Sequence, residues 1–252
     1  MKKFRLDKNI LFSLLSIAFL WLFWLIAYYC VKNEYVLPSI GATFSEMGKL
    51  LASGSFWTAF GNTLLRTFGA FAFSLVFGTL LAVAALLHKG IRAFFAPIIS
   101  ILRTVPTMAI VLVLLLWTTP AFAPVVVSVL VLLPAVYAAV LASLDDVKTR
   151  YDEMARAYRV SLGKRITQIY LPLAAPPVLK QAGGIFSMGL KITVSGEVLA
   201  STYRSLGGLM QQAKAFVQMP ELLALTILTV LIGFALEGLC LLAYKLIVRW
   251  RA

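Results

Sequence analysis

The sequence contains few of the residues from which catalytic and metal-binding sites are usually built. It has one histidine, His88, and two cysteines, Cys30 and Cys240, which lie in or beside apolar segments and lack metal-ligand spacing. No G-x-x-x-x-G-K-[ST] segment is present, so the chain has no P-loop for nucleotide phosphates. No Ser/His/Asp set or pair of carboxylates points to catalysis. We therefore expect a chain that is not an enzyme and binds no metal or cofactor of its own.

Charged residues are also scarce. They make up 13% of the chain, against roughly 25% in soluble domains, and the mean hydropathy is +0.93. Several apolar runs reach the roughly 20 residues that a helix needs to cross about 30 Å of hydrocarbon. No Pro/Gly/Ser-rich linker divides the sequence. These features predict an all-α, polytopic integral membrane protein with a single domain over residues 1–252.

Six membrane-spanning helices are predicted, because a helix satisfies its own backbone hydrogen bonds in lipid. The first apolar run follows the basic segment MKKFRLDKN but is longer than the apolar part of a signal peptide and lacks a small-x-small cleavage site. We expect it to be retained as the first span. The six spans cover about 10–31, 60–87, 97–117, 124–144, 176–199 and 222–246.

The distribution of Lys and Arg predicts the orientation. If the N-terminus is cytoplasmic, seventeen of the 23 basic residues fall on the inner side. Two more lie within spans, Arg66 and Lys191, and only four lie outside: Lys32, Lys49, Arg204 and Lys214. Because cytoplasmic loops are enriched in positive charge, both termini are expected in the cytoplasm. The net charge of +13 therefore reflects membrane topology, and we expect no nucleic-acid partner.

The outer segment 32–57 is expected to contain a short helix that lies on the membrane surface. Pro38 and Ser39 form a helix start, and the apolar residues that follow have helical spacing: Phe44, Met47, Leu50 and Leu51.

The polar segment 145–175 lies between the fourth and fifth spans. Arg156 is spaced to pair with Asp152 and with Glu153, which favours a helix. We expect this helix to break at 161–163 and a second short helix to end before Pro172, which disfavours helical geometry in the preceding residue. From composition alone, an amphipathic loop resting on anionic headgroups is an alternative.

The order of residues in this loop resembles the EAA signature of permease subunits of ATP-binding-cassette (ABC) importers. Five positions match the signature in residue type and spacing: Glu153, Ala155, Ile169, Leu171 and Pro172. Two positions depart from it, because Met154 replaces an alanine and Arg159 stands at the usual glycine. Gly163 follows four residues after that position. The resemblance implies a coupling helix that docks into the ATP-binding subunit. The charges and apolar contacts of this helix would come from Glu153, Arg156 and Tyr158. The turn after it would involve Arg159 and Gly163, and the loop would end at Pro172.

Four further segments resemble the nitrate/sulfonate/taurine branch of these importers: LPS at 37–39, NTLLRTFGAF at 62–71, LRTVPTMAI at 102–110 and GEVLASTYRSLGGLMQQA at 196–213. The resemblance implies a type I importer permease fold in the cell (inner) membrane. It also implies a homodimer, two ATP-binding subunits that carry ATP and Mg, and an extracytoplasmic substrate-binding protein that contacts 32–57 and 200–219. The substrate would be a small anion, or a pyrimidine resembling a thiamine precursor.

Several polar residues within the spans are candidates for the translocation pathway. Ser187, Lys191 and Ser195 share one helical face, and a charge in mid-membrane usually faces water or protein. A structural pair or a snorkelling lysine is the alternative for Lys191. Glu197 would be a gate, a contact of the binding protein or an interface-level carboxylate. Two residues of the 102–110 segment, Pro106 and Met108, are further candidates for the translocation pathway.

An autonomous secondary transporter or channel is the alternative function. Such proteins usually carry a relay of ionisable groups inside the membrane. Here only Lys191 and Glu237 are deep charges, which disfavours this alternative.

Overall fold

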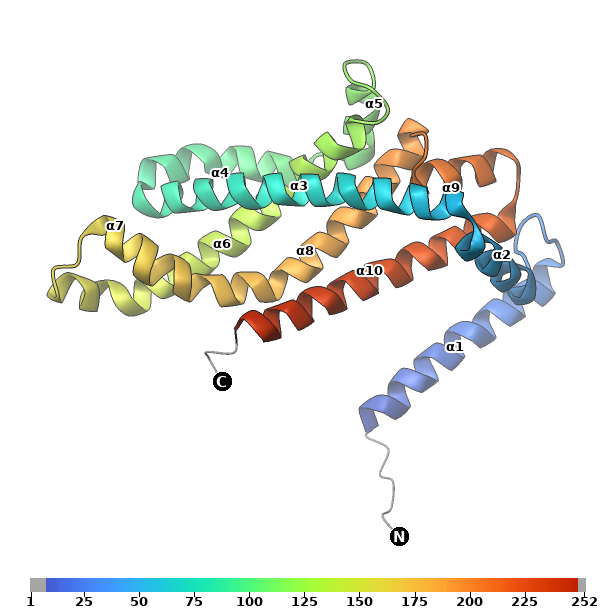
Figure 1. Cartoon of the computed structure of the whole chain (residues 1–252), viewed down its shortest axis with the longest axis horizontal. Helices are drawn as coiled ribbons and strands as arrows, with labels where there is room; N and C mark the ends of the chain where they lie inside the picture. The colour runs from blue at the N-terminus through green and yellow to red at the C-terminus, as the bar shows by residue number, and fades with distance from the viewer. Residues whose placement is uncertain (1–7, 249–252) are drawn as a thin grey trace, which may run out of the picture.

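The computed structural model describes residues 8–248, and every regular element in this range is helical (Figure 1). This confirms the all-α fold. In chain order the elements are α1 (Lys8–Val31), α2 (Ile40–Ala52), α3 (Gly54–Leu87), α4 (Lys89–Thr104), α5 (Thr107–Leu114), α6 (Ala123–Ala157), α7 (Leu162–Lys164), the π-helix η1 (Arg165–Tyr170), α8 (Leu171–Ala200), α9 (Leu206–Ala215) and α10 (Met219–Ile247).

Three of these helices, α3, α6 and α10, are long and apolar enough to cross a membrane. The pair α4 and α5 would make a fourth span if counted as one broken helix. The other two predicted spans coincide with α1 and α8, and their crossing of the membrane stays a prediction. The basic residues used for the orientation at 2–5 and 249–251 lie outside the described part of the chain.

The third predicted span is not one straight helix. The chain bends by 92° between α4 and α5, and Val105 at the break is extended, with φ −66° and ψ 131°. Pro106 follows directly, and proline disfavours helical geometry in the residue before it. Pro106 therefore interrupts the segment predicted as the third span, 97–117, and turns α5 away from α4.

The core of the bundle is built by α3, α6, α8 and α10 (Figure 1). The buried face of α3 carries mainly small residues at helical spacing, including Ala59, Thr63, Thr67, Ala70, Ser74, Gly78, Ala82 and Ala85. A Cβ atom at Gly78 would lie 3.0 Å from Cγ1 of Val136 in α6, so the two backbones approach closely. Small residues allow such close packing between membrane helices, where lipid supplies no hydrophobic driving force between them.

Two glycines of α8 allow close packing against neighbouring helices. A Cβ atom at Gly183 would lie 3.0 Å from Cβ of Cys240 in α10. A Cβ atom at Gly189 would lie 2.9 Å from Cδ1 of Leu132 in α6. Gly184 faces open space instead.

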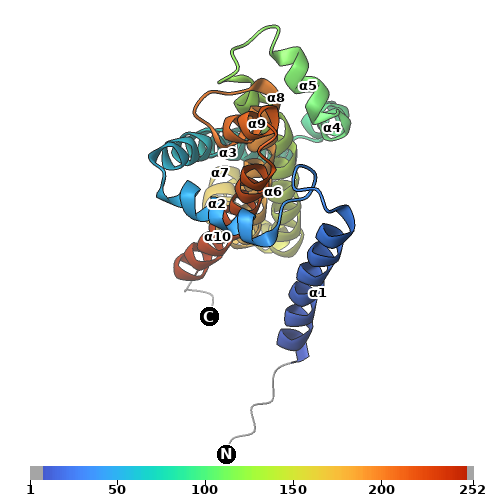
Figure 2. The same cartoon turned by 90° about the vertical axis from the view of Figure 1, so that its right-hand side faces the viewer.

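The short helix predicted after Pro38 and Ser39 is confirmed as α2, while its position on the outer face stays a prediction. It begins at Ser39, whose side chain accepts a hydrogen bond from the backbone N–H of Ala42, and it buries Met47 and Leu50. The first helix, α1, stands apart from the bundle in both views (Figures 1 and 2). It reaches the rest of the chain through Trp21, which stacks on Phe44 of α2 at 5.6 Å between ring centroids.

The two ends of the bundle differ. The turn between α6 and α7 lies at one end of the long axis, and α2 and α9 lie at the other (Figure 1). This separation agrees with the sequence prediction, which assigned 145–175 to the inner side and 32–57 and 200–219 to the outer side.

Candidate functional site

The helix that precedes the polar loop extends well past its predicted span. At 1.5 Å per residue, the 35 residues of α6 are about 52 Å long, against about 30 Å of hydrocarbon. The residues from Asp145 to Ala157 therefore continue the span as one rigid helix beyond the predicted membrane edge. A rigid extension of a core helix is suited to transmitting a force to the bundle.

The end of α6 has the hydrogen bonds of a Schellman motif. The N–H of Val160 donates to the carbonyl of Ala155, and the N–H of Arg159 donates to that of Arg156, both at 2.9 Å. Arg159 lies in the left-handed region with φ 54°. This is the position at which the EAA signature carries glycine, and left-handed geometry is what glycine adopts at little cost. The backbone at this position therefore has the conformation that suits the signature's glycine, although the residue is arginine.

Replacing Arg159 with glycine is expected to stabilise the protein by about 1 kcal/mol, because a side chain in the left-handed region costs roughly 1–2 kcal/mol. Thermal unfolding of the purified chain measures the change. The matched control is Arg150→Gly, which lies inside α6 and should destabilise by a similar amount. If both substitutions lower the unfolding temperature equally, Arg159 is not strained.

The segment after the turn differs from the prediction. The break lies at 158–161, Gly163 is inside α7 rather than at the turn, and α7, η1 and α8 run on as one helical segment. In the π-helix the N–H of Leu171 reaches the carbonyl of Ile166, five residues back. Pro172 then follows the π-helix directly, as the second residue of α8, inside this continuous helical segment. The prediction that a short helix ends before Pro172 was therefore wrong.

Asp152 is the centre of a polar cluster that ties the two arms of this loop together. Its Oδ1 atom accepts a hydrogen bond from the hydroxyl of Tyr170 at 2.6 Å and lies 3.3 Å from Nη1 of Arg165. Its Oδ2 atom lies 2.8 Å from Nη2 of Arg156. Arg165 also donates through Nε to the carbonyl of Val160 at 2.7 Å. The cluster therefore fixes the angle between α6 and the segment that enters α8.

The electrostatics of this cluster favour a charged Asp152, which lies beyond the predicted span. The hydrogen bond from Tyr170, with further contributions from Arg156 and Arg165, holds the pKa of Asp152 below its ordinary value. Burial, followed by the bond to Asp152, raises the pKa of Tyr170. Asp152 is thus an anion and Tyr170 a neutral donor at neutral pH.

The outer surface of the loop presents apolar side chains between charges. Met154 is 50% exposed and Tyr158 is 79% exposed, and Glu153 and Arg159 lie on the surface beside them. Ala155 is buried instead. Within the described residues Glu153 has no ion pair, because Arg156 pairs with Asp152; the expected pair between Glu153 and Arg156 was wrong.

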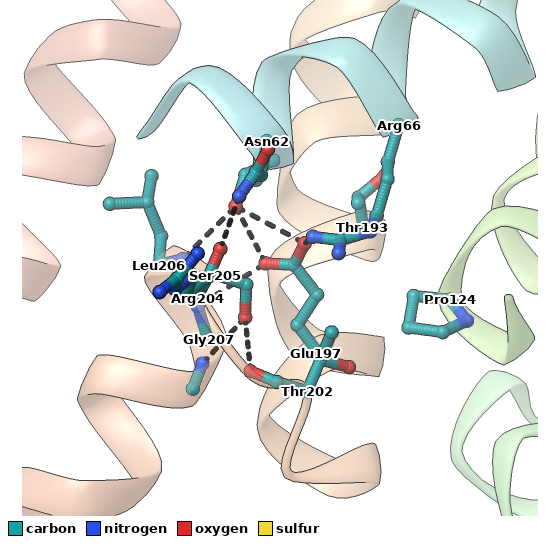
Figure 3. Close-up of polar contacts among 12 residues, drawn as sticks. Asn62, Arg66, Pro124, Thr193, Glu197, Thr202, Arg204, Ser205, Leu206 and Gly207 are labelled. Atoms are coloured by element: carbon teal, nitrogen blue, oxygen red, sulfur yellow. Dashed lines mark hydrogen bonds and ion pairs between the residues drawn. The ribbon is translucent and has the colours of Figure 1, made fainter. Parts of the chain in front are cut away.

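At the opposite end, Glu197 is fully buried in a network that joins α3, α8 and α9 (Figure 3). Its carboxylate accepts a hydrogen bond from the hydroxyl of Thr63 at 2.8 Å and lies 2.9 Å from Nη1 of Arg66. The backbone N–H of Gly207 donates to it at 3.2 Å, and the N–H of Leu206 donates to the Thr63 hydroxyl at 3.0 Å. Glu197 is thus placed as a connection between three helices rather than as a surface contact for substrate or a binding protein.

Gly207 is required for the close approach of α9 to α8. A Cβ atom there would lie 2.6 Å from the carbonyl oxygen of Val194 and 2.6 Å from the backbone nitrogen of Val198. Arg66, which lies within the second predicted span, is the partner of the buried acid. Thr63 was missed, although it lies on the small-residue face of α3.

The face of α8 that includes Lys191 is only partly as predicted. Lys191 and Ser195 are exposed, but Ser187 is buried and its hydroxyl faces Gly233 of α10. Ser187 therefore does not share the open face. That face is a stripe at helical spacing: Lys180, Gln181, Gly184, Met188, Lys191 and Ser195.

Pro106 and Met108 lie at the bend between α4 and α5 and are both exposed, Met108 to 63%. The helix α5 packs against α6 and α8. The bend and the polar stripe of α8 are therefore in neighbouring elements, as a shared pathway requires.

A cavity of about 800 Å³ opens at the end of the bundle that carries α9, between the start of α3 and the segment 201–216. Hydrogen-bonding and aromatic side chains line it, including Thr58, Thr202, Tyr203, Arg204, Gln212 and Phe216. Within residues 8–248 no group of three His, Cys, Asp or Glu side chains could hold a metal ion.

Comparison with known proteins gives a family match over most of the chain. Residues 74–251 match the family described as binding-protein-dependent transport system inner membrane component. The putative aliphatic sulfonates transport permease protein SsuC of Bacillus subtilis is 25% identical over 228 residues, which cover 88% of this chain and 80% of that protein. The taurine transport system permease protein TauC of Escherichia coli is 25% identical over 182 residues, which cover 72% of this chain and 66% of that protein.

Two solved structures share the fold. The crystal structure of an amino acid ABC transporter with histidines aligns with a TM-score of 0.63 and 17% identity, covering 73% of this chain and 89% of that one. The inward-facing MetNI methionine ABC transporter aligns with a TM-score of 0.59 and 20% identity, covering 74% of this chain and 94% of that one. The expected fold of an importer permease is confirmed.

Proposed function

Because the chain belongs to the family of binding-protein-dependent transport system inner membrane components, we propose that it is the permease subunit of an ABC importer for a small sulfonate-type anion. The match over residues 74–251 is the observation that carries the proposal. The sulfonate and taurine permeases among its sequence relatives support the substrate class.

The ATP-binding subunit docks at the loop between α6 and α8. The rigid extension of α6 carries Glu153, Met154 and Tyr158 on its surface, and Asp152 clamps it to the segment leading into α8. A motion imposed on the loop by ATP binding would therefore move α6 and α8 together. Two ATP-binding subunits, with their ATP and Mg, act on two copies of this chain.

The pathway runs along the open face of α8. A lysine and a glutamine on a helix that crosses lipid require water or protein beside them. Lys191, which has no ion-pair partner within residues 8–248, provides a positive charge for an anion between the two copies. Alternating access arises when the two copies tilt and expose this face first to one side and then to the other.

The substrate-binding protein docks at the outer end. The cavity near Tyr203 and Arg204 offers it exposed aromatic and cationic groups, and Tyr203 is 74% exposed. The network around Glu197 holds the outer end of α3 against α9, so the docking surface is rigid.

Reversing the charge of Glu153 is expected to reduce recovery of the ATP-binding subunit at least tenfold. Glu153 is exposed and has no ion pair within the described residues, so Glu153→Lys should remove the docking charge without damaging the fold. Tagged wild-type and variant chains are purified from native membranes in mild detergent, and their partners are identified by mass spectrometry.

Glu34→Lys is the matched control, because it makes the same charge reversal on an exposed residue at the outer side. It should leave recovery of the ATP-binding subunit unchanged. If folded wild-type protein brings down no ATP-binding subunit, the importer proposal fails.

A further inference from the structure

A groove lined by both apolar and charged side chains lies between α4 and α6, away from the stripe on α8. Its volume is about 400 Å³. The side chains that border it include Arg92, Ser100, Arg103, Tyr137, Leu141 and Asp145. An ion pair bounds it at one end and a hydrogen bond to a backbone carbonyl at the other.

One end of the groove is at the inner edge, where Arg92 of α4 pairs with Asp145 of α6 at 3.0 Å. At the other end Nη2 of Arg103 donates to the carbonyl of Pro134 at 3.2 Å. Each helix advances eleven residues between the two contacts, which is about 16 Å at 1.5 Å per residue. With the Arg92–Asp145 pair at the predicted inner edge, Arg103 lies about halfway through the hydrocarbon layer of about 30 Å, deeper than the inner-side position predicted from the sequence.

The groove does not lie on the lipid-facing side of α4. The exposed apolar residues Phe94, Ile98 and Ile101 share one face of this helix. At 100° per residue, the groove residues of α4 lie on the opposite face: Arg92, Ala96, Ser100 and Arg103. Lipid thus covers the first face, and the polar face requires water or protein.

The deep end of the groove has unused hydrogen-bond donors. Within residues 8–248 Arg103 has no carboxylate partner, and its guanidinium makes a single hydrogen bond, although it carries five N–H donors. The hydroxyl of Tyr137 also has no hydrogen-bond partner there, although its side chain is only 6% exposed. Because Asp145 neutralises Arg92, the net positive charge of the groove lies at Arg103.

We propose that the groove between α4 and α6 is an anion-binding site in the cytoplasmic half of the membrane, with Arg103 as its principal ligand. A guanidinium holds the oxygens of a sulfonate or phosphate-like group in a bidentate manner. The hydroxyls of Tyr137 and Ser100 add donors from the two walls. The assignment rests on the proposed importer function and adds a second cationic site to Lys191.

The test measures which charged reagents reach the groove. Ser100→Cys is introduced into a chain with Cys30→Ser and Cys240→Ala, and the full complex is placed in lipid nanodiscs. Labelling rates are compared for sulfonatoethyl methanethiosulfonate, an anion, and trimethylammonioethyl methanethiosulfonate, a cation. The rate for the anionic reagent is divided by the rate for the cationic reagent, and this ratio is normalised to the same ratio for a free thiol in solution. The normalised ratio should be about ten, because Arg103 raises the local concentration of anions.

Arg103→Gln should lower this rate ratio about tenfold, and Arg103→Lys should preserve most of it. Arg150→Gln removes an equal charge from exposed α6 surface outside the groove and should change the ratio less than twofold. A thiol at the lipid-facing position, Leu80→Cys, should react with neither reagent.

Two outcomes overturn the proposal. If neither reagent modifies the thiol introduced at Ser100, lipid or the second copy fills the groove. If both react but Arg103→Gln leaves the ratio unchanged, Arg103 does not bind anions there. Labelling requires neither transport nor ATP, so it can be repeated on this chain alone in nanodiscs. If no ATP-binding subunit co-purifies but the chain alone keeps the Arg103-dependent anion preference, only the importer function is overturned and the anion site is retained.

Discussion

Glu197→Ala is expected to destabilise the protein by about 3–5 kcal/mol, the largest stability change among the substitutions considered. The substitution leaves Arg66, whose side chain is only 18% exposed, without its counter-charge in a water-poor site. It also removes the acceptor of the Gly207 N–H, so α9 loses one of its attachments to α8. For a chain of this length, the apparent unfolding temperature should fall by about 10 °C.

The matched control is Glu46→Ala. Glu46 pairs with Lys49 at 2.6 Å, but both side chains are substantially exposed, so its loss should cost no more than about 0.5 kcal/mol. Adding Arg66→Leu to Glu197→Ala should restore part of the lost stability, because it removes the unpaired buried charge. If Glu197→Ala shifts the unfolding temperature no more than Glu46→Ala, the carboxylate does not hold the three helices together.

Only part of the network around Glu197 could be predicted from the sequence. The apolar runs and the spacing of small residues were sufficient to predict a helical membrane protein, and the start of α2 at Ser39 could be predicted from its capping side chain. Glu197 could be recognised as an acid within a span. Its partner Thr63 could not, because the two are 134 positions apart and only packing brings α3 and α8 together.

The effect of a proline on its helix was the feature that the sequence predicted least well. Pro106 produces a 92° bend, while Pro172 is accommodated in a continuous helical segment. Both residues disfavour helix in the position before them, and the sequence alone does not show which neighbour absorbs the strain. At Pro172 the wide π-turn of η1 absorbs it; at Pro106, Val105 becomes extended and the helix ends.

Asp152→Ala is expected to reduce ATP-driven uptake about tenfold in proteoliposomes that contain the full importer. The substitution removes the acceptor for Tyr170 and the counter-charge for Arg156 and Arg165. The docking surface on α6 would then no longer move rigidly with α8. Because Asp152 touches no substrate, the number of substrate molecules imported per ATP hydrolysed should fall more than the rate of ATP hydrolysis.

The defect should be the same at pH 6 and pH 8. The pKa of Asp152 is lowered in the folded protein, so its stabilising effect is present above the unfolded value of about 3.9 and is lost only as the pH falls through the lower folded value. Tyr170→Phe, which removes one donor to Asp152, should give a smaller loss of uptake in the same direction.

Asp146→Ala provides the matched control in the same helix. Asp146 is exposed and, within residues 8–248, pairs only with Arg150 one turn away, so uptake and its coupling to ATP should remain at the wild-type level. Equal uptake per ATP in Asp152→Ala and Asp146→Ala would mean that the clamp is dispensable. In that case the continuity of η1 with α8 would be sufficient to transmit the motion, and the polar cluster around Asp152 would serve only the stability of the loop.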